Sequence, residues 1–198
     1  MTLQDLFLLS PEASLALLAL GVVGLDLLVE RKGAVVAVAA AGLLVPFAFT
    51  VVLWGEVAGQ ALPGVFNTLV VDRFALFFKG LFLASAFLVL MASVEWAPRL
   101  GWWVGEYCAL LLASAGGMML LAAATELVTL YISLELTALP LAALAAFQRD
   151  ARSSEAGLKF LLLSGIASAV LLYGLALTYG FAGSTWLRDV REALVGLG

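Results

Sequence analysis

The amino-acid sequence predicts an all-α integral membrane protein with about six transmembrane helices. Of its 198 residues, 64% are hydrophobic and 12% are charged, and the mean hydropathy is +1.13. A water-soluble domain of this composition would expose a very large apolar surface. The charges gather in short segments between long apolar runs, so we expect each run to cross the bilayer as a helix.

Six apolar runs are long enough, because a spanning helix needs about 20 mostly apolar residues. They lie near 11–29, 34–54, 74–94, 107–124, 127–147 and 156–180. Together they predict a transmembrane helical bundle over residues 1–183, followed by a polar interfacial segment over 184–198. Almost no loop separates the fourth and fifth runs at Thr125 and Glu126, so these two helices should be antiparallel neighbours.

The basic residues of the loops predict an orientation, because Lys and Arg in short loops favour the cytoplasmic side. One set of loops holds five of them: Arg31, Lys32, Arg99, Arg149 and Arg152. The other set holds three: Arg73, Arg188 and Arg191. We therefore expect a multi-pass protein of the plasma (inner) membrane with its N-terminus outside.

Composition excludes several functions. The chain has no His, and Cys108 is its only cysteine, so its own side chains cannot build a haem site, an iron–sulfur cluster or an ordinary zinc site. The net charge of −4 argues against a nucleic-acid partner. Buried carboxylate and lysine chemistry suits the transport of protons or sodium ions, and we expect no cofactor bound by this chain.

Glu135 is the leading candidate site residue. It lies about nine residues into the fifth run, near mid-membrane, and its neighbours at helical spacing supply no countercharge. The opposite side of the same helix carries Thr129, Ser133 and Thr137, which indicates a helix inside a bundle rather than against lipid. Glu135 is then either a proton-exchanging group or a protonated residue hydrogen-bonded across helices.

Lys159 is the second candidate, early in the sixth run, where Ser153 or Ser154 is expected to cap the helix. Glu155 lies four residues before it, so a local ion pair or extension to the interface is the competing interpretation. Lys79, in the third run, and Asp26, at the end of the first, are second-tier candidates that we expect to act as interface anchors.

Small residues in two of the runs predict close helix packing, and we assign them no chemical role. They occur in the fourth run at Gly116 and Gly117 and in the sixth at Ser164, Gly165, Ala167, Ser168 and Ala169.

Several stretches resemble one family. The segments Leu130 to Leu144, LYISLELTALPLAAL, and Ser153 to Gly183, SSEAGLKFLLLSGIASAVLLYGLALTYGFAG, resemble the antiporter-like N subunit of respiratory complex I, the NADH:quinone oxidoreductase. Val71 to Leu83, VDRFALFFKGLFL, and Glu106 to Glu135 are similar to the third to fifth helices of the same family. The likeness covers roughly the last two-thirds of the chain.

This resemblance implies a function and roles for residues. The family's fifth-helix glutamate falls on Glu135 and its sixth-helix lysine on Lys159, which implies that both belong to a proton-translocation route. The family glutamate pairs with a lysine on a broken seventh helix. Members have about fourteen helices in two inverted repeats, so the chain corresponds to the N-terminal portion of such a subunit and lacks that lysine.

The expected function is therefore that of a proton-translocating, non-redox membrane subunit of an NADH:quinone oxidoreductase. NADH, FMN, the iron–sulfur clusters and quinone are expected in partner subunits, and the other membrane subunits, the lipid bilayer and protons are the expected partners. One alternative is a subunit of a multi-subunit sodium/proton antiporter. A second is a non-conducting membrane scaffold, in which Glu135 and Lys159 would be dispensable.

Overall fold

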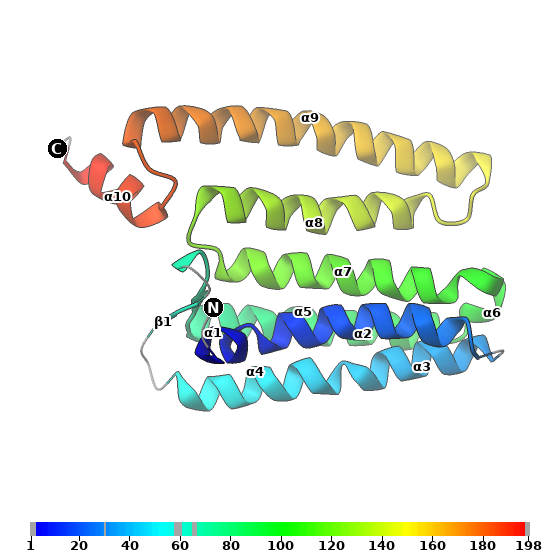
Figure 1. The fold of residues 1–198 in the computed structure, drawn as a ribbon. Helices are drawn as coiled ribbons and strands as arrows, with labels where there is room; N and C mark the ends of the chain where they lie inside the picture. Colours follow the sequence, from blue (N-terminus) through cyan, green and yellow to red (C-terminus); the bar gives the residue numbers. More distant parts are fainter. Residues whose placement is uncertain (1–2, 30, 58–60, 65–66, 197–198) are drawn as a thin grey trace.

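Long helices lying side by side make up most of the molecule (Figure 1). The computed structural model describes residues 3–29, 31–57, 61–64 and 67–196. The helices are α1 (Leu3–Leu8), α2 (Ser10–Asp26), α3 (Lys32–Gly42), α4 (Leu44–Glu56), α5 (Arg73–Ser93), α6 (Ala97–Leu100), α7 (Val104–Ala123), α8 (Leu127–Ala145), α9 (Ala151–Ala182) and α10 (Leu187–Val195), with a 3₁₀ turn at Gly101–Trp103. All six predicted apolar runs are therefore helical over most of their length.

Five segments of the described chain are long and apolar enough to cross a membrane. They are Lys32–Glu56, Arg73–Ser93, Gly101–Ala123, Leu127–Ala145 and Ala151–Ala182. The first of these joins α3 and α4 through Leu43. The first apolar run forms α2, whose 17 residues span only about 26 Å at 1.5 Å per residue. The predicted all-α multi-pass membrane fold is thus confirmed, with α2 as a shorter helix inside the same bundle.

The core of the bundle forms where α2, α3, α5 and α7 meet. Its fully buried side chains are small or aliphatic and come from all four helices, including Leu15, Val36, Leu90, Leu112 and Met119. Burying such apolar side chains contributes about 25 cal/mol per Å² where water is the reference. Here it mainly provides close packing, because lipid is also apolar. In Figure 1, α8 lies beside α7, and α9 lies beyond α8 at one edge of the bundle, opposite α3 and α4.

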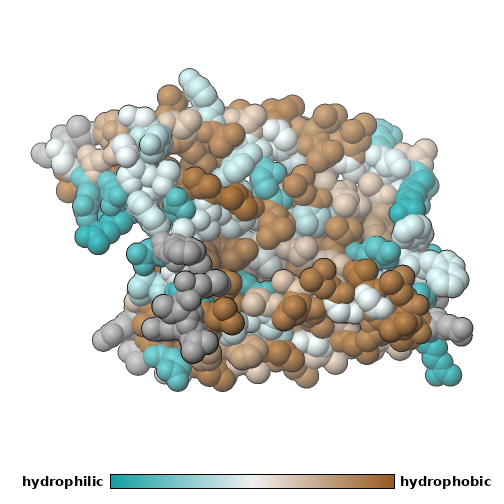
Figure 2. Space-filling view, viewed as in Figure 1, coloured by the Kyte–Doolittle hydropathy of each residue, from teal (hydrophilic) through white to brown (hydrophobic). Residues whose placement is uncertain are grey.

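The outer surface is apolar where it faces away from the core. Large hydrophobic side chains there are well exposed, among them Leu17, Leu20 and Leu88 at 67–72%. Figure 2 shows hydrophobic residues over most of the middle of one face and hydrophilic residues gathered mainly at its two ends. A bilayer would cover the apolar part and leave the ends to water.

Three short segments meet at the end of the bundle where α7 ends and α8 begins. Strands β1 (Leu62–Pro63) and β2 (Val70–Val71) pair antiparallel, with Leu62 opposite Val71. Single bridges join Leu69 to Ala124 and Glu126 to Trp186, so the α7–α8 turn is tied to both the hairpin and the segment before α10. The predicted antiparallel contact of the fourth and fifth helices is confirmed, since α7 and α8 pack along their length.

The last long helix begins earlier than the sequence predicts. Asp150, rather than Ser153 or Ser154, is the cap, and its Oδ1 accepts a 2.6 Å hydrogen bond from the Ser153 amide. The prediction of a serine cap was wrong because Asp150 supplies the same acceptor three residues earlier, which is the usual capping geometry. The helix ends at Gly183, whose φ of +69° favours glycine.

Candidate functional site

Glu135 lies in the middle of α8, eight residues after the helix begins at Leu127. That position is about 12 Å along a helix of about 28 Å. The carboxyl group is half-buried and accepts a hydrogen bond at Oε1 from the Ser168 hydroxyl of α9. Among the described residues, no lysine or arginine forms an ion pair with it. Glu135 is thus held by a polar group of a neighbouring helix.

The other side of α8 packs closely on α7 and is polar at the contact. Ser114 of α7 donates a 3.2 Å hydrogen bond to the Thr137 carbonyl. A Cβ added at Gly117 would lie 2.6 Å from Thr137 Oγ1 and 2.7 Å from its amide nitrogen. Ser133, which is 1% exposed, donates to the Thr129 carbonyl at 2.7 Å. The predicted small-residue contact at Gly117 is confirmed, and it packs one side of the Glu135 helix closely against α7.

Lys159 does not join Glu135. Its Nζ lies 2.5 Å from Glu155 Oε1, one turn earlier on α9, and the two side chains are 69% and 63% exposed. This is the local Glu-to-Lys pair that the four-residue spacing favours. The structure therefore places the two leading candidates apart, with Glu135 facing its helix neighbour and Lys159 on an open face.

The small residues of α9 behave differently from those of α7. A Cβ added at Gly165 would meet no atom within 4 Å, so this part of the predicted close packing has no partner among the described residues. Close contact occurs instead at Gly157, where an added Cβ would lie 2.5 Å from the Ala146 Cβ. Ser168 was predicted to serve helix packing alone, but its hydroxyl donates a hydrogen bond to Glu135.

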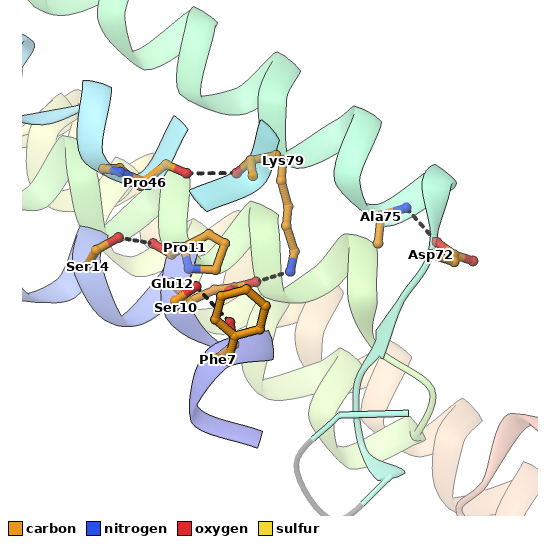
Figure 3. Close-up of polar contacts among 10 residues, drawn as sticks. Phe7, Ser10, Pro11, Glu12, Ser14, Pro46, Asp72, Ala75 and Lys79 are labelled. Atoms are coloured by element: carbon orange, nitrogen blue, oxygen red, sulfur yellow. Dashed lines mark hydrogen bonds and ion pairs between the residues drawn. The ribbon is translucent and has the colours of Figure 1, made fainter. Parts of the chain in front are cut away.

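A second buried polar site lies in the core half of the bundle, where Lys79 of α5 reaches Glu12 of α2 (Figure 3). The Lys79 Nζ and Glu12 Oε1 are 2.6 Å apart, and the side chains are 1% and 7% exposed. Lys79 is therefore not the interface anchor that its position near the helix start predicts. Lys79 can be buried because Glu12 supplies a countercharge beside its ammonium group.

Glu12 was missed by reasoning from the sequence. It follows Pro11 in the first turn of α2, where an acidic residue is expected simply to favour the helix dipole. It could have been identified only by matching its position in the sequence with that of Lys79. Glu12 and Lys79 both lie a few residues inside helices that start at the same end of the bundle.

Asp26 is a structural residue at the opposite end of α2. Its side chain is 5% exposed, and Lys32 Nζ donates to its Oδ1 at 2.9 Å and to its carbonyl at 3.1 Å. A Cβ added at Gly105 would lie 2.6 Å from the Asp26 Cβ. These contacts tie together the turn from α2 to α3 and the start of α7, so Asp26 anchors the fold near the bundle end.

Carboxyl and ammonium groups of this kind can bind and release protons. In the part of the chain that the structure describes, no group of three His, Cys, Asp or Glu residues comes together. Two carboxyl groups of the helices remain as candidates. One is Glu135 with a hydroxyl partner, and the other is Glu12 with an ammonium partner.

Comparisons with known proteins bear on the family and the fold. The family model described as NADH:quinone oxidoreductase/Mrp antiporter, TM, matches residues 124–197, which hold Glu135 and Lys159. NADH-quinone oxidoreductase subunit N of Moorella thermoacetica is 41% identical over 99% of this chain and 41% of its own length. The subunit N of Dehalococcoides mccartyi is 40% identical over 94% of this chain and 38% of its own. The chain thus spans about two fifths of these relatives.

Two solved structures have the same fold. A chain of respiratory complex I from Thermus thermophilus superposes with a TM-score of 0.74 at 32% identity, over 89% of this chain and 38% of that one. A chain of an archaeal membrane-bound sulfane sulfur reductase gives a TM-score of 0.82 at 20% identity, over 94% and 39% of the two chains, which supports the fold alone. The chain belongs to the family of antiporter-like membrane subunits that includes subunit N of NADH-quinone oxidoreductase.

Proposed function

We propose that this chain is part of a proton-translocating membrane subunit of an NADH:quinone oxidoreductase. The observation that carries the proposal is the Glu135 carboxyl, held mid-helix within the segment that matches the family and hydrogen-bonded to α9. An ionisable residue in that position is costly, and such residues in membrane proteins commonly mark ion or proton pathways. Glu135 is the group that binds and releases the proton or sets the affinity of a partner for it.

The chemistry needs a countercharge that changes during turnover. At an effective dielectric near 20, a unit charge about 4 Å from Glu135 is worth roughly 4 kcal/mol, which is enough to load or unload a proton. We assign this countercharge to a basic group outside the described chain, because Lys159 already pairs with Glu155. Lys159 is the next group on the route, and it would act after leaving that exposed pair.

The remaining parts of the machinery belong to other chains in this proposal. NADH, FMN, the iron–sulfur clusters and quinone are bound by partner subunits, and this subunit is driven by charge and conformational change that quinone reduction causes. Its neighbours are the other membrane subunits of the complex. The excess of basic residues at the loops near Lys32, Arg99 and Arg149 favours a plasma-membrane orientation with the N-terminus outside.

The test is proton pumping by the intact complex that carries Glu135→Ala in this subunit. Pumping and coupled quinone reduction should fall together, because the proton step limits both. Glu192→Ala is the matched control, since that glutamate is 65% exposed on α10 and pairs only with Arg188 among the described residues. Wild-type pumping in Glu135→Ala would refute the proposal.

Two rival functions predict different results. A subunit of a sodium/proton antiporter would be purified in an assembly that neither oxidises NADH nor contains iron–sulfur proteins. The relatives reported above are named as NADH-quinone oxidoreductase subunits, which favours the oxidoreductase. A non-conducting scaffold would keep full activity when Glu135 and Lys159 are neutralised and lose it when the Gly117 contact is disturbed.

A further inference from the structure

The Glu12–Lys79 pair differs from an ordinary structural ion pair in its hydrogen bonding. Glu12 is 8% exposed and Lys79 1% exposed. Glu12 Oε1 lies 2.6 Å from the Lys79 Nζ but outside hydrogen-bond geometry, and Oε2 has no hydrogen-bond partner among the described residues. A buried pair that serves stability alone gains from satisfying every oxygen and proton, because each unpaired polar atom costs free energy.

The carboxylate borders a small cavity. The cavity has about 10 Å³ of space and is lined by Leu8, Leu9, Glu12, Gly64, Leu69, Val71 and Lys79. This volume is near the smallest that holds one water molecule. Such a water could take hydrogen bonds from Lys79 Nζ and donate one to Glu12 Oε2, which gives it two polar partners.

Of the residues that line the cavity, Glu12 and Lys79 are the titratable ones. Neighbouring elements pack apolar side chains around this region: Leu8 and Leu9 near α1, Leu53 and Val57 at the end of α4, Leu69 and Val71 from the hairpin, and Leu120 and Ala123 from α7. Asp72 is directed elsewhere, since its Oδ1 accepts a 2.7 Å hydrogen bond from the Ala75 amide at the start of α5 (Figure 3).

The β1–β2 hairpin forms part of the cavity wall. It contributes the lining residues Gly64, Leu69 and Val71, and the two strands pair over only two residues each. Short two-stranded ribbons have little stability of their own. Opening the hairpin, which is also bridged to the α7–α8 turn at Ala124, would connect Glu12 with water.

We propose that Glu12 and Lys79 form a second proton-exchange site, separate from Glu135, which communicates with the aqueous phase beneath the β1–β2 hairpin. A proton from water binds the Glu12 carboxylate and returns by the same path, and Lys79 balances the charge of the unprotonated form. No bond other than O–H forms or breaks. A contribution of this site to pumping rests on the proposed function, whereas proton binding at Glu12 does not.

The test compares infrared spectra of the intact purified complex as pH is changed. The wild type should show a pH-dependent carboxylic-acid carbonyl component that is missing from Glu12→Gln/Lys79→Met, while the components of the other carboxyl groups, Glu135 included, remain. This double variant is chosen because replacing both charges of a buried pair is tolerated far better than replacing one. Arg188→Gln/Glu192→Gln removes an exposed pair and should retain the component assigned to Glu12.

A second variant covers the case in which the double variant does not assemble. Glu12→Asp keeps the charge but shortens the side chain, so the signal should persist with a shifted midpoint. Spectra of wild type and double variant that superimpose across the pH range, or a Glu12→Asp midpoint identical to wild type, would overturn the second site.

Pumping distinguishes this site from the proposed function. Glu12→Gln/Lys79→Met should lose pumping while the complex stays assembled. If Glu135→Gln pumps normally, the proposed function fails, whatever Glu12 does. If Glu135→Gln loses pumping while the double variant pumps normally, Glu12–Lys79 is a structural pair and only this inference is overturned.

Discussion

Charged side chains are paired differently in the two halves of this bundle. Between α2 and α5, Lys79 and Glu12 neutralise each other inside the described chain, and apolar helices surround them. Between α8 and α9, Glu135 has only a hydroxyl partner, and Lys159 is 69% exposed beside Glu155. The first half contains both members of its charged pair, whereas the second holds a carboxyl group without a cation among the described residues.

Packing shows the same contrast. Helix α7 has nine buried residues, but Gly157 is the only buried residue of α9 among those described. An apolar helix that packs mainly on one long helix, α8, suits contact with lipid or with further membrane helices. The charge pairing and packing of the core half can therefore be explained from this chain alone. The role of Glu135 depends on what lies against α8 and α9.

The largest stability effect should follow the loss of one member of the buried pair. Lys79→Met leaves the buried Glu12 carboxyl without its countercharge, which should cost about 3–5 kcal/mol of unfolding free energy. Glu12→Gln/Lys79→Met should cost much less. Thermal or denaturant unfolding in detergent measures both. Equal losses in the single and double variants would show that the charges themselves contribute little.

The same glycine substitution should have opposite effects in the two halves. Gly117→Ala drives a methyl group into the Thr137 backbone, within 2.7 Å of its nitrogen, and should cost about 1–3 kcal/mol through overpacking. Gly165→Ala meets nothing within 4 Å and should raise helix stability by up to about 1 kcal/mol. Unfolding midpoints compare the two variants directly. A stable Gly117→Ala would contradict the close α7–α8 contact.

A pH effect is expected at the start of α9. The hydrogen bond from the Ser153 amide lowers the pKa of Asp150 from its usual value of 3.8. The capping contribution is therefore complete above that value and is lost as pH falls through the lowered pKa. Amide exchange at Ser153 should quicken over that acid range. In Asp150→Asn, which keeps a capping oxygen without a charge, exchange should show no such transition.

The smallest effect is expected on α10. Arg188 and Glu192 form a 3.1 Å pair, with side chains 85% and 65% exposed. Arg188→Gln should change the unfolding free energy by about 0.5 kcal/mol or less, because exposed pairs are screened and entropically costly. Equilibrium unfolding checks this. A loss comparable to that of Lys79→Met would mean that α10 contributes to the bundle core.

Local patterns predicted the helices well, and pairings between helices poorly. Runs of apolar residues identified the spans, and the short Thr125–Glu126 connection correctly paired α7 with α8. Glu12 and Ser168 were missed as partners because each lies far along the chain from the group it contacts, Lys79 and Glu135 respectively. The early start of α9 was missed because Asp150 and Ser153 are both good caps, and only the structure distinguishes them.

The most direct test of the account is the rate of proton pumping by the intact complex with Glu135→Gln and Glu135→Asp. Glutamine keeps the size of the side chain and a hydrogen-bond acceptor for Ser168 but removes the acid, whereas aspartate keeps the acid. We predict that Glu135→Gln loses pumping and coupled quinone reduction, while Glu135→Asp retains part of both. Pumping by Glu135→Gln at the wild-type rate would contradict the account.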